Sequence, residues 1–209
     1  MRGLYALKPC YTDRLSLIEL LADRRAISPD AFTAVGVAGA AAAGLALWQG
    51  WYVAAGLMLA VRLAGANLDG AVARARGVSR SWGFVLNEIG DRTSDLLMFA
   101  GLVALANRTA DPDERLLVVG AALVATLAAN LPTLASLAAA GAGAQRRNGG
   151  PLGKTERCAL VVVACAVPGW LVGISALIVV GSLVTTGLRL RATAVELRTT
   201  RLVASAADR

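Results

Sequence analysis

Long apolar runs, separated by short polar segments, constrain the fold of this chain more than any other feature. They cover residues 29–48, 51–73, 83–105, 116–140, 158–172 and 173–188. A helix needs about 20 apolar residues to cross a hydrocarbon layer about 30 Å thick. The first four runs meet that length, and the last two are shorter. The runs predict an all-α integral membrane protein with six transmembrane helices.

The segment Val167-Pro168-Gly169-Trp170 decides how the last two runs are connected. Pro and Gly favour a tight turn, and Trp prefers the membrane interface. We therefore expect the fifth and sixth helices to form a hairpin. One long broken helix is the alternative, and it would place the C-terminus on the other side of the membrane.

The composition agrees with a membrane protein and excludes several kinds of site. Of the 209 residues, 56% are hydrophobic and 17% are charged, against about 25% charged in soluble domains. Histidine is absent, which rules out imidazole catalysis, haem ligation by histidine and His-containing zinc sites. The three cysteines, Cys10, Cys158 and Cys165, have no metal-ligand spacing.

The two ends of the chain are more polar than its middle. Residues 1–27 alternate charged and apolar side chains, which is typical of an amphipathic helix at the membrane interface. Ser28 and Pro29 then form a favourable helix start, with Ser as N-cap and Pro in the first turn. We expect one membrane domain over 1–209, with an interfacial helix (1–27), six spans (28–188) and a cytoplasmic tail (189–209).

The basic residues predict the orientation in the membrane. With six spans and the N-terminus inside, nearly all of them fall in cytoplasmic segments, as the positive-inside rule requires. Arg108 and Arg115 fall outside, and Arg62 and Arg92 lie within spans. The net charge of +7 then reflects orientation and attraction to anionic lipid, so we expect no nucleic-acid partner.

A motif of spaced polar residues joins the second and third runs. It reads Ala66-Asn67-Leu68-Asp69-Gly70-Ala71-Val72-Ala73-Arg74, then eight residues, then Gly83, Asn87 and Asp91 at four-residue steps. This resembles the signature of the CDP-alcohol phosphotransferases, D-x-x-D-G-x-x-A-R, eight residues, G-x-x-x-D-x-x-x-D. Ala66 and Asn87 stand at the first and third Asp positions. The run from Asn87 to Asp91 (Asn-Glu-Ile-Gly-Asp) resembles a variant subgroup of bacterial members.

Two antiparallel helices would bring the polar residues of this motif together. Asn87, Asp91 and Asp95 lie four residues apart and so share a helix face. Ionisable side chains within spans cost about 2.5–3.5 kcal/mol each on insertion scales, which indicates a partner or a function. We expect Asp69, Asn87 and Asp91 to face one point near the cytoplasmic side.

The resemblance implies an enzyme that transfers a phosphatidyl group from CDP-diacylglycerol or a similar CDP-alcohol to an acceptor alcohol in phospholipid synthesis. Motif carboxylates hold one or two Mg²⁺ or Mn²⁺ ions against the diphosphate, and the last Asp, here Asp91, is the general base. By the same resemblance, metal would bind Asp69, Asn87 and Asp91. The CDP group would contact Asp69, Gly70, Ala73, Arg74 and Gly83. A homodimer in a bacterial inner membrane, with its active site facing the cytoplasm, is also implied.

The replaced motif positions leave the metal-binding part of the site open to two interpretations. Ala66 has no ligating side chain, and Asn87 offers a neutral oxygen. Either one metal binds, tightly or together with the CDP diphosphate, or neighbours compensate for the lost carboxylates. The candidate compensators are Asn67, Glu88 and Asp95. Arg62 lies four residues before Ala66 on the same face, where its guanidinium would either neutralise charge at the metal position or pair with a buried aspartate.

Basic residues before the fifth run are candidates for binding the acceptor. Gly153-Lys154 resembles a G-K segment of family members, and Arg146, Lys154 and Arg157 would receive an acceptor that carries a phosphate. Positive-inside retention alone is the alternative. Two other functional classes compete with the enzyme: an impaired family member that binds CDP-lipid or acts as a scaffold, and a small transporter. The transporter is disfavoured, because the two halves of the chain contain no paired spans broken by Gly or Pro.

Overall fold

The described part of this computed structural model, residues 26–207 with side chains to residue 200, consists of helices and contains no strand. The expected interfacial helix falls on residues 1–27 and, apart from its last two positions, lies outside the described residues. The helices are α3 (Pro29–Gln49), α4 (Tyr52–Ala75), α5 (Ser81–Thr109), α6 (Arg115–Gly141), α7 (Lys154–Ala166), the short 3₁₀ helix η2 (Pro168–Trp170) and α8 (Leu171–Ala207).

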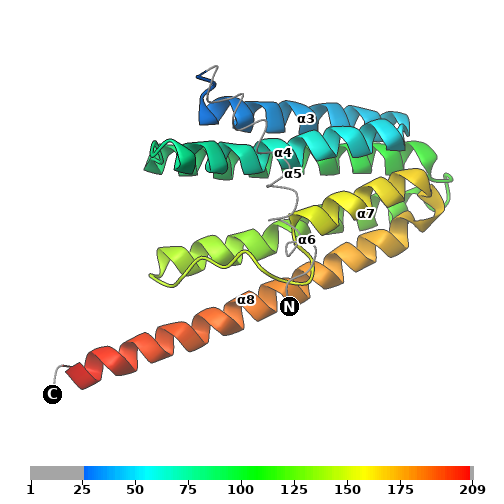
Figure 1. Ribbon diagram of the computed structural model, residues 1–209. Coiled ribbons are helices and arrows are strands. Elements are labelled where there is room, and N and C mark those ends of the chain that lie inside the picture. Colours follow the sequence, from blue (N-terminus) through cyan, green and yellow to red (C-terminus); the bar gives the residue numbers. More distant parts are fainter. Residues whose placement is uncertain (1–25, 208–209) are drawn as a thin grey trace.

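The helices run back and forth along one direction (Figure 1). α3 packs against both α4 and α5, and α6 packs against α8, with α7 contacting α4 and α8. The connections at 50–51, 110–114 and 167–170 lie at one end of the bundle. The connections at 76–80 and 142–153 lie at the other end. All the motif residues lie in the half of the bundle nearer this second end.

The first helix begins where the sequence predicts. The Ser28 hydroxyl accepts a hydrogen bond from the Ala31 amide at 3.3 Å, and Pro29 occupies the first turn. The helix ends at Gly50, whose φ of 77° is readily available to glycine. The bounds of α4, α5 and α6 differ from the expected runs by a few residues, chiefly because their ends extend into polar sequence.

The hairpin expected near residue 168 is present, and the single broken helix is wrong. α7 ends at Ala166 and the chain reverses through η2 before α8 begins at Leu171 (Figure 1). Val167 precedes a proline, which disfavours helical backbone at that residue. The expected boundary at residues 172–173 was therefore several residues late, and α7 itself begins earlier, at Lys154. The expected tail is not separate from the sixth helix, since α8 continues unbroken to Ala207.

Four stretches among the described residues have the length and apolarity to cross a membrane. They are Pro29–Gln49, Tyr52–Ala75, Arg115–Gly141 and Pro168–Thr200. α5 has 29 residues, but Glu88, Asp91, Arg92 and Asp95 interrupt its apolar sequence. α7 has only 13 residues, or about 20 Å at 1.5 Å per residue. The described part of the chain is thus all-helical, with four candidate spans.

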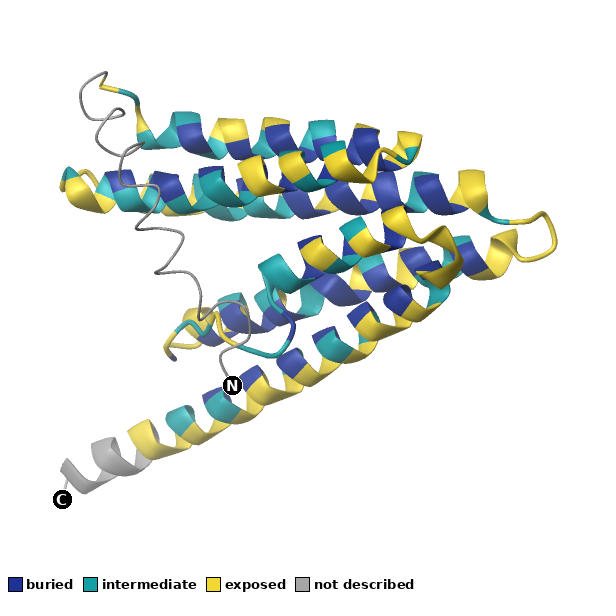
Figure 2. Ribbon diagram, turned by 45° about the vertical axis from the view of Figure 1, so that its right-hand side comes forward, coloured by how far each residue is buried: buried dark blue, intermediate teal, exposed yellow. Residues whose placement is uncertain are grey.

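Small residues let the backbones of the first three helices approach closely. A Cβ atom at Gly101 would lie 2.4 Å from the Gly44 carbonyl oxygen, so α3 and α5 touch there backbone to backbone. Gly65 and Gly36 make the same kind of contact between α4 and α3. Such contacts are typical of helix pairs in membranes. Large apolar side chains such as Leu116 and Leu127 are exposed instead, and exposed positions alternate with buried ones along the helices (Figure 2).

Candidate active site

Asp69 is held in a fixed orientation by two neighbouring helices. It lies on α4 with its side chain buried, and the Thr33 hydroxyl of α3 donates to its Oδ2 at 2.8 Å. The Gly70 amide lies 2.5 Å from its Oδ1. The close packing of α3 on α4 at Gly36 and Gly65 brings Thr33 into reach. Each oxygen of the carboxylate thus accepts one hydrogen bond, and the side chain still lines a cavity.

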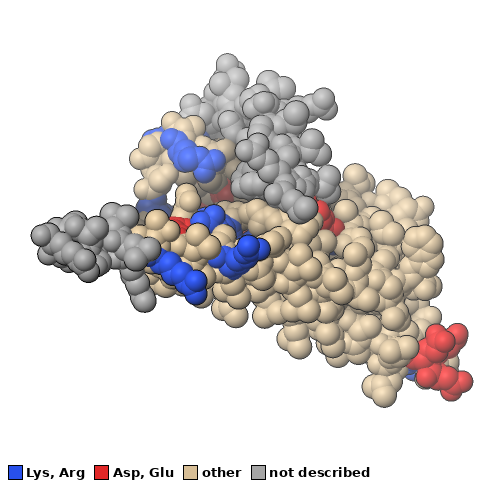
Figure 3. All heavy atoms as spheres, turned by 90° about the horizontal axis from the view of Figure 1, so that it is seen from below, with Lys and Arg blue, Asp and Glu red and all other residues tan. Residues whose placement is uncertain are grey.

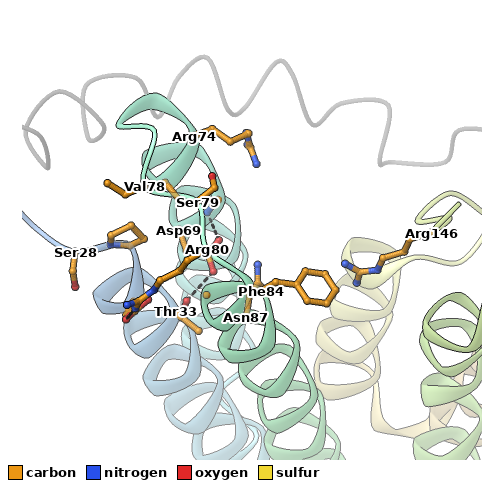
Figure 4. A pocket seen from close by; sticks show the side chains of 15 residues that line it. Ser28, Thr33, Asp69, Arg74, Val78, Ser79, Arg80, Phe84, Asn87 and Arg146 are labelled. Atoms are coloured by element: carbon orange, nitrogen blue, oxygen red, sulfur yellow. Dashed lines mark hydrogen bonds and ion pairs between the residues drawn. The ribbon is translucent and has the colours of Figure 1, made fainter. Parts of the chain in front are cut away.

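A cavity of about 520 Å³ opens above Asp69. Its lining includes all five residues expected to contact CDP, namely Asp69, Gly70, Ala73, Arg74 and Gly83. Figure 4 shows this cavity with Arg74 on its rim. The Arg74 guanidinium lies against Gly70, 3.0 Å from the position that a Cβ atom there would take. The cavity has the size of a small-molecule site.

Several residues of this cavity carry no motif signal in the sequence. Arg80 pairs with Asp30 across the outer wall, joining the α4–α5 loop to the start of α3. Phe84 lies under the Arg146 guanidinium, 5.2 Å from ring centre to Cζ. Figure 4 shows Arg146 entering from a different part of the chain, the loop between α6 and α7. Only this long-range contact identifies Arg146 as a residue of the first cavity.

Asp69, Asn87 and Asp91 converge as the motif predicts. They line a void of about 10 Å³ together with Ala66 and Arg62, which is room for about one water-sized group. Two carboxylates and one amide oxygen form an all-oxygen donor set that suits one Mg²⁺ or Mn²⁺ ion completed by water or substrate oxygens. In the described part of the chain, no group of three or more His, Cys, Asp or Glu side chains is placed to hold a metal.

A second cavity of about 180 Å³ has Asp91 in its lining. Its lining includes the three residues expected to receive the acceptor, Arg146, Lys154 and Arg157. The Lys154 Nζ lies 2.5 Å from Asp91 Oδ1, so the first turn of α7 contacts α5 at the candidate base. Asn87 and Arg146 line both cavities. Asp91 therefore lines this second cavity, which is rich in cationic side chains, and also the small void, which shares Asp69 and Asn87 with the first cavity.

The three candidate compensators do not line the small void. Asn67 lines the second cavity and donates to the Leu63 carbonyl at 2.5 Å, and Glu88 pairs with Arg146. Asp95 lies deeper, in ion pairs with Arg62, Arg92 and Arg157. Of the two interpretations of Arg62, the ion pair with a buried aspartate is therefore present.

Arg189 is a site residue that the sequence did not indicate. Its place in the expected tail suggested only a cytoplasmic positive charge, yet its side chain is buried on α8 and lines the second cavity. Its guanidinium donates to the carbonyls of Pro132, Asn148 and Gly149 at 2.6–2.9 Å. Arg189 thus fixes the α6–α7 loop, which carries Arg146. Continued helical periodicity past residue 188 was the available signal.

Comparisons with known proteins point to one family. The family model described as CDP-alcohol phosphatidyltransferase matches residues 26–194. The fold is similar to that of Mycobacterium tuberculosis phosphatidylinositol phosphate synthase with CDP-DAG bound, at 26% identity and a TM-score of 0.71, covering 84% of this chain and 91% of that one. The same enzyme with manganese and citrate gives 27% identity and a TM-score of 0.70, covering 84% and 87%.

A search of curated protein sequences found no match. The family model nevertheless covers well over half of the chain and includes every motif residue discussed above. The chain belongs to the CDP-alcohol phosphatidyltransferase family, the membrane enzymes that transfer a phosphatidyl group from a CDP-linked lipid to an alcohol in phospholipid synthesis.

Proposed function

We propose that this enzyme uses CDP-diacylglycerol as donor and a polar alcohol that itself carries a phosphate as acceptor. The observation that carries the proposal is that Asp91 lines both the second cavity and the small void, whose Asp69 and Asn87 also line the first cavity. The first cavity has room for a nucleotide and contains Arg74 and Asp69. The second is lined by Arg146, Lys154 and Arg157, whose charges suit a phosphate monoester. The similar M. tuberculosis enzyme, with CDP-DAG bound, is a phosphatidylinositol phosphate synthase.

In this arrangement the chain's own residues position both reactants. Arg74 and the backbone around Gly70 bind the CDP group in the first cavity, with the diphosphate toward Asp69. Ala73 and Gly83 leave room for the nucleotide because their side chains are small. Lys154, Arg157 and Arg146 bind the acceptor's phosphate, which places its free hydroxyl beside Asp91. One divalent cation held by Asp69, Asn87 and Asp91 would neutralise charge on the diphosphate.

Asp91 then acts as the general base. Its carboxylate takes the proton of the acceptor hydroxyl, and the resulting oxygen attacks the β-phosphorus. A new phosphorus–oxygen bond to the acceptor forms as the bond from the β-phosphorus to the bridging oxygen breaks. CMP leaves with that oxygen, and the product is a phosphodiester that carries the diacylglycerol and the acceptor.

We further propose that all six long helices cross the membrane, with the active site facing the cytoplasm of a bacterial cell. α5 connects the end of the bundle where α4 finishes to the end where α6 begins, so it traverses the same thickness as its neighbours. α7 is short, but the loop before it is packed into the protein at Ala144 and Leu152. Irregular backbone is tolerated at membrane depth when it is buried in protein. A homodimer is proposed on the resemblance alone.

The test is CMP release by the purified protein in detergent or nanodiscs. The donor is CDP-diacylglycerol with Mg²⁺ or Mn²⁺, and the acceptors are polyols with and without a phosphate group. We expect CMP release with a phosphorylated acceptor and much less with its unphosphorylated counterpart. Lys154→Met should raise KM for the acceptor, whereas Arg191→Met, on an exposed part of α8, should not.

The competing function is a catalytically impaired protein that binds CDP-lipid, and the replaced carboxylates at Ala66 and Asn87 favour it. Retained CDP binding without CMP release for any acceptor would establish that function instead. Equal CMP release with phosphorylated and unphosphorylated acceptors would support the transferase activity but contradict the proposal that the acceptor carries a phosphate.

A further inference from the structure

Arg62 occupies an unusual position for a buried arginine. Its side chain is 1% exposed on α4, and its guanidinium donates to Asp95 and, at 2.9 Å, to the Cys158 sulfur. Its Nε atom has no hydrogen-bond partner among the described residues. The same side chain lines the small void that Asp69, Asn87 and Asp91 share. A fully buried cation with an unsatisfied N–H therefore borders the void with the metal-binding oxygens.

The charges around this void favour anions over a second cation. Asp95 is already paired with Arg62, Arg92 and Arg157, and Asp91 is paired with Lys154. Together with Asp69, the cationic side chains of this cluster exceed its carboxylates by one. The Ala66 side of the void contributes no oxygen ligand. A second divalent ion there would meet a buried guanidinium at short range without a carboxylate to compensate.

We propose that this enzyme works with a single divalent cation, and that Arg62 takes over the charge of a second one. Asp69 and Asp91 would hold this cation, with Asn87 as a neutral ligand. The Arg62 guanidinium stabilises the diphosphate of the CDP group from the Ala66 side by its fixed positive charge. This inference rests on the proposed function and specifies how the altered motif of this chain binds its donor.

A charge role and a structural role for Arg62 predict different results. A fixed cation beside the metal position repels Mn²⁺ and attracts the nucleotide diphosphate. Arg62→Met, which keeps much of the side-chain length, should therefore strengthen Mn²⁺ binding in the absence of nucleotide. It should weaken CDP binding in the presence of a chelator. A single charge about 4–6 Å away changes the affinity of a site for a proton by about tenfold to a thousandfold. We expect each of the two affinities to change by about tenfold, at the lower end of that range. Arg62→Lys should restore both affinities.

The experiment uses the full chain in nanodiscs, with Mn²⁺ and CDP as probes. Bound Mn²⁺ is counted by electron paramagnetic resonance with CDP present, and both affinities are measured by calorimetry. Gel filtration confirms that each variant is folded, which is expected because Asp95 keeps Arg92 and Arg157 as partners. We expect one Mn²⁺ per wild-type chain and opposite changes of the two affinities in Arg62→Met.

Two Mn²⁺ ions per wild-type chain would overturn the inference, whatever the variants show. Mn²⁺ and CDP affinities that fall together in Arg62→Met would also overturn it, since that is the result of a merely structural arginine. These outcomes are independent of catalysis. A chain that binds one Mn²⁺ ion but releases no CMP would contradict the proposed function and leave this inference standing. A chain that binds two Mn²⁺ ions and releases CMP would support the proposed function and contradict this inference.

Discussion

At the residue scale, the two motif carboxylates differ in how they are held. Asp69 receives hydrogen bonds from Thr33 and from the Gly70 amide, which fix both of its oxygens. The described contact of Asp91 is with the mobile end of a lysine, Lys154. A rigid carboxylate suits binding, whereas one that must exchange a partner for a substrate proton suits catalysis. The difference agrees with Asp69 as a ligand and Asp91 as the base.

Asp91→Asn should abolish turnover while leaving the nucleotide site in place. The amide keeps the shape of the side chain but cannot accept the proton of the acceptor hydroxyl. We expect kcat for CMP release to fall by about 10²–10⁴-fold, the usual contribution of a general base. CDP affinity measured in the absence of divalent cations should change little, because Asp91 is absent from the lining of the first cavity. Asp113→Asn, at the other end of the molecule, is the control, and unchanged kcat in Asp91→Asn would refute the assignment.

Thr33→Val should weaken donor binding with little effect on kcat. The substitution removes the hydroxyl that orients Asp69 and keeps the shape of the side chain. Loss of one such hydrogen bond is worth about 1 kcal/mol, so KM for CDP-diacylglycerol should rise roughly fivefold. Thr126→Val is the matched control, since that hydroxyl donates only to the Ala122 carbonyl of its own helix. Equal KM values for both variants would show that Thr33 does not position Asp69.

The sequence predicted the motif residues and the basic residues before the fifth run, and it missed Thr33 and Arg189. Asp69, Asn87 and Asp91 converge because their spacing places them on the facing sides of two helices. Thr33 and Arg189 could not be found in this way. Neither has a charge pattern that points to the site, and both reach it through the packing of α3 on α4 and of α8 on the α6–α7 loop. Such contacts depend on tertiary structure.

At the scale of helices, the close contact of α3 with α5 helps to hold the two motif helices, α4 and α5, in place. The backbones of α3 and α5 meet at Gly44 and Gly101, about half a helix length from the site. The lengths of the apolar runs predicted where helices form, and the first four helices lie close to their expected positions. The last two were misjudged because α7 starts inside a basic segment and α8 continues through one. Hydropathy alone does not register helix that is polar on one side.

Gly101→Val should destabilise the protein. The new Cβ would lie 2.4 Å from the Gly44 carbonyl oxygen, so α3 and α5 would have to separate. Overpacking of this kind costs about 1–3 kcal/mol. We expect a lower midpoint in thermal unfolding, measured by tryptophan fluorescence in detergent. Gly120→Val is the matched control, because a Cβ at Gly120 meets no atom within 4 Å. Equal midpoints for the two variants would show that the α3–α5 contact is not tight.

Arg189→Met should impair acceptor binding through the α6–α7 loop. The variant loses the donors that hold the Pro132, Asn148 and Gly149 carbonyls, so Arg146 is no longer fixed at the second cavity. KM for the acceptor should rise about tenfold or more, because each hydrogen bond from a charged donor is worth about 1.5–3 kcal/mol. KM for CDP-diacylglycerol should rise less. Arg191→Met is the control, and an unchanged acceptor KM in Arg189→Met would exclude this positioning role.

At the scale of the whole molecule, charge is distributed unevenly along the bundle. Lys and Arg side chains gather toward one end, while a group of acidic side chains lies at the opposite end (Figure 3). The acidic end contains the α5–α6 loop with Asp111, Asp113 and Glu114, and the basic end contains Arg76, Arg80 and Arg147. In the orientation proposed above, which follows the positive-inside rule, the basic end faces the cytoplasm. A CDP-linked lipid would then enter from the side where nucleotides are made.

Cysteine labelling tests this orientation together with the number of spans. Ser79 and Gly169 are both exposed and lie in connections at opposite ends of the bundle. In a background lacking Cys10, an impermeant maleimide applied to intact spheroplasts should label Gly169→Cys and spare Ser79→Cys. After permeabilisation both should react, whereas the buried Cys158 and Cys165 should stay protected in the parent chain. The reverse labelling pattern would mean that the protein has the opposite orientation, with the active site outside. Protection of both positions before permeabilisation would mean that α7 does not cross, because Gly169 would then lie on the same side as Ser79.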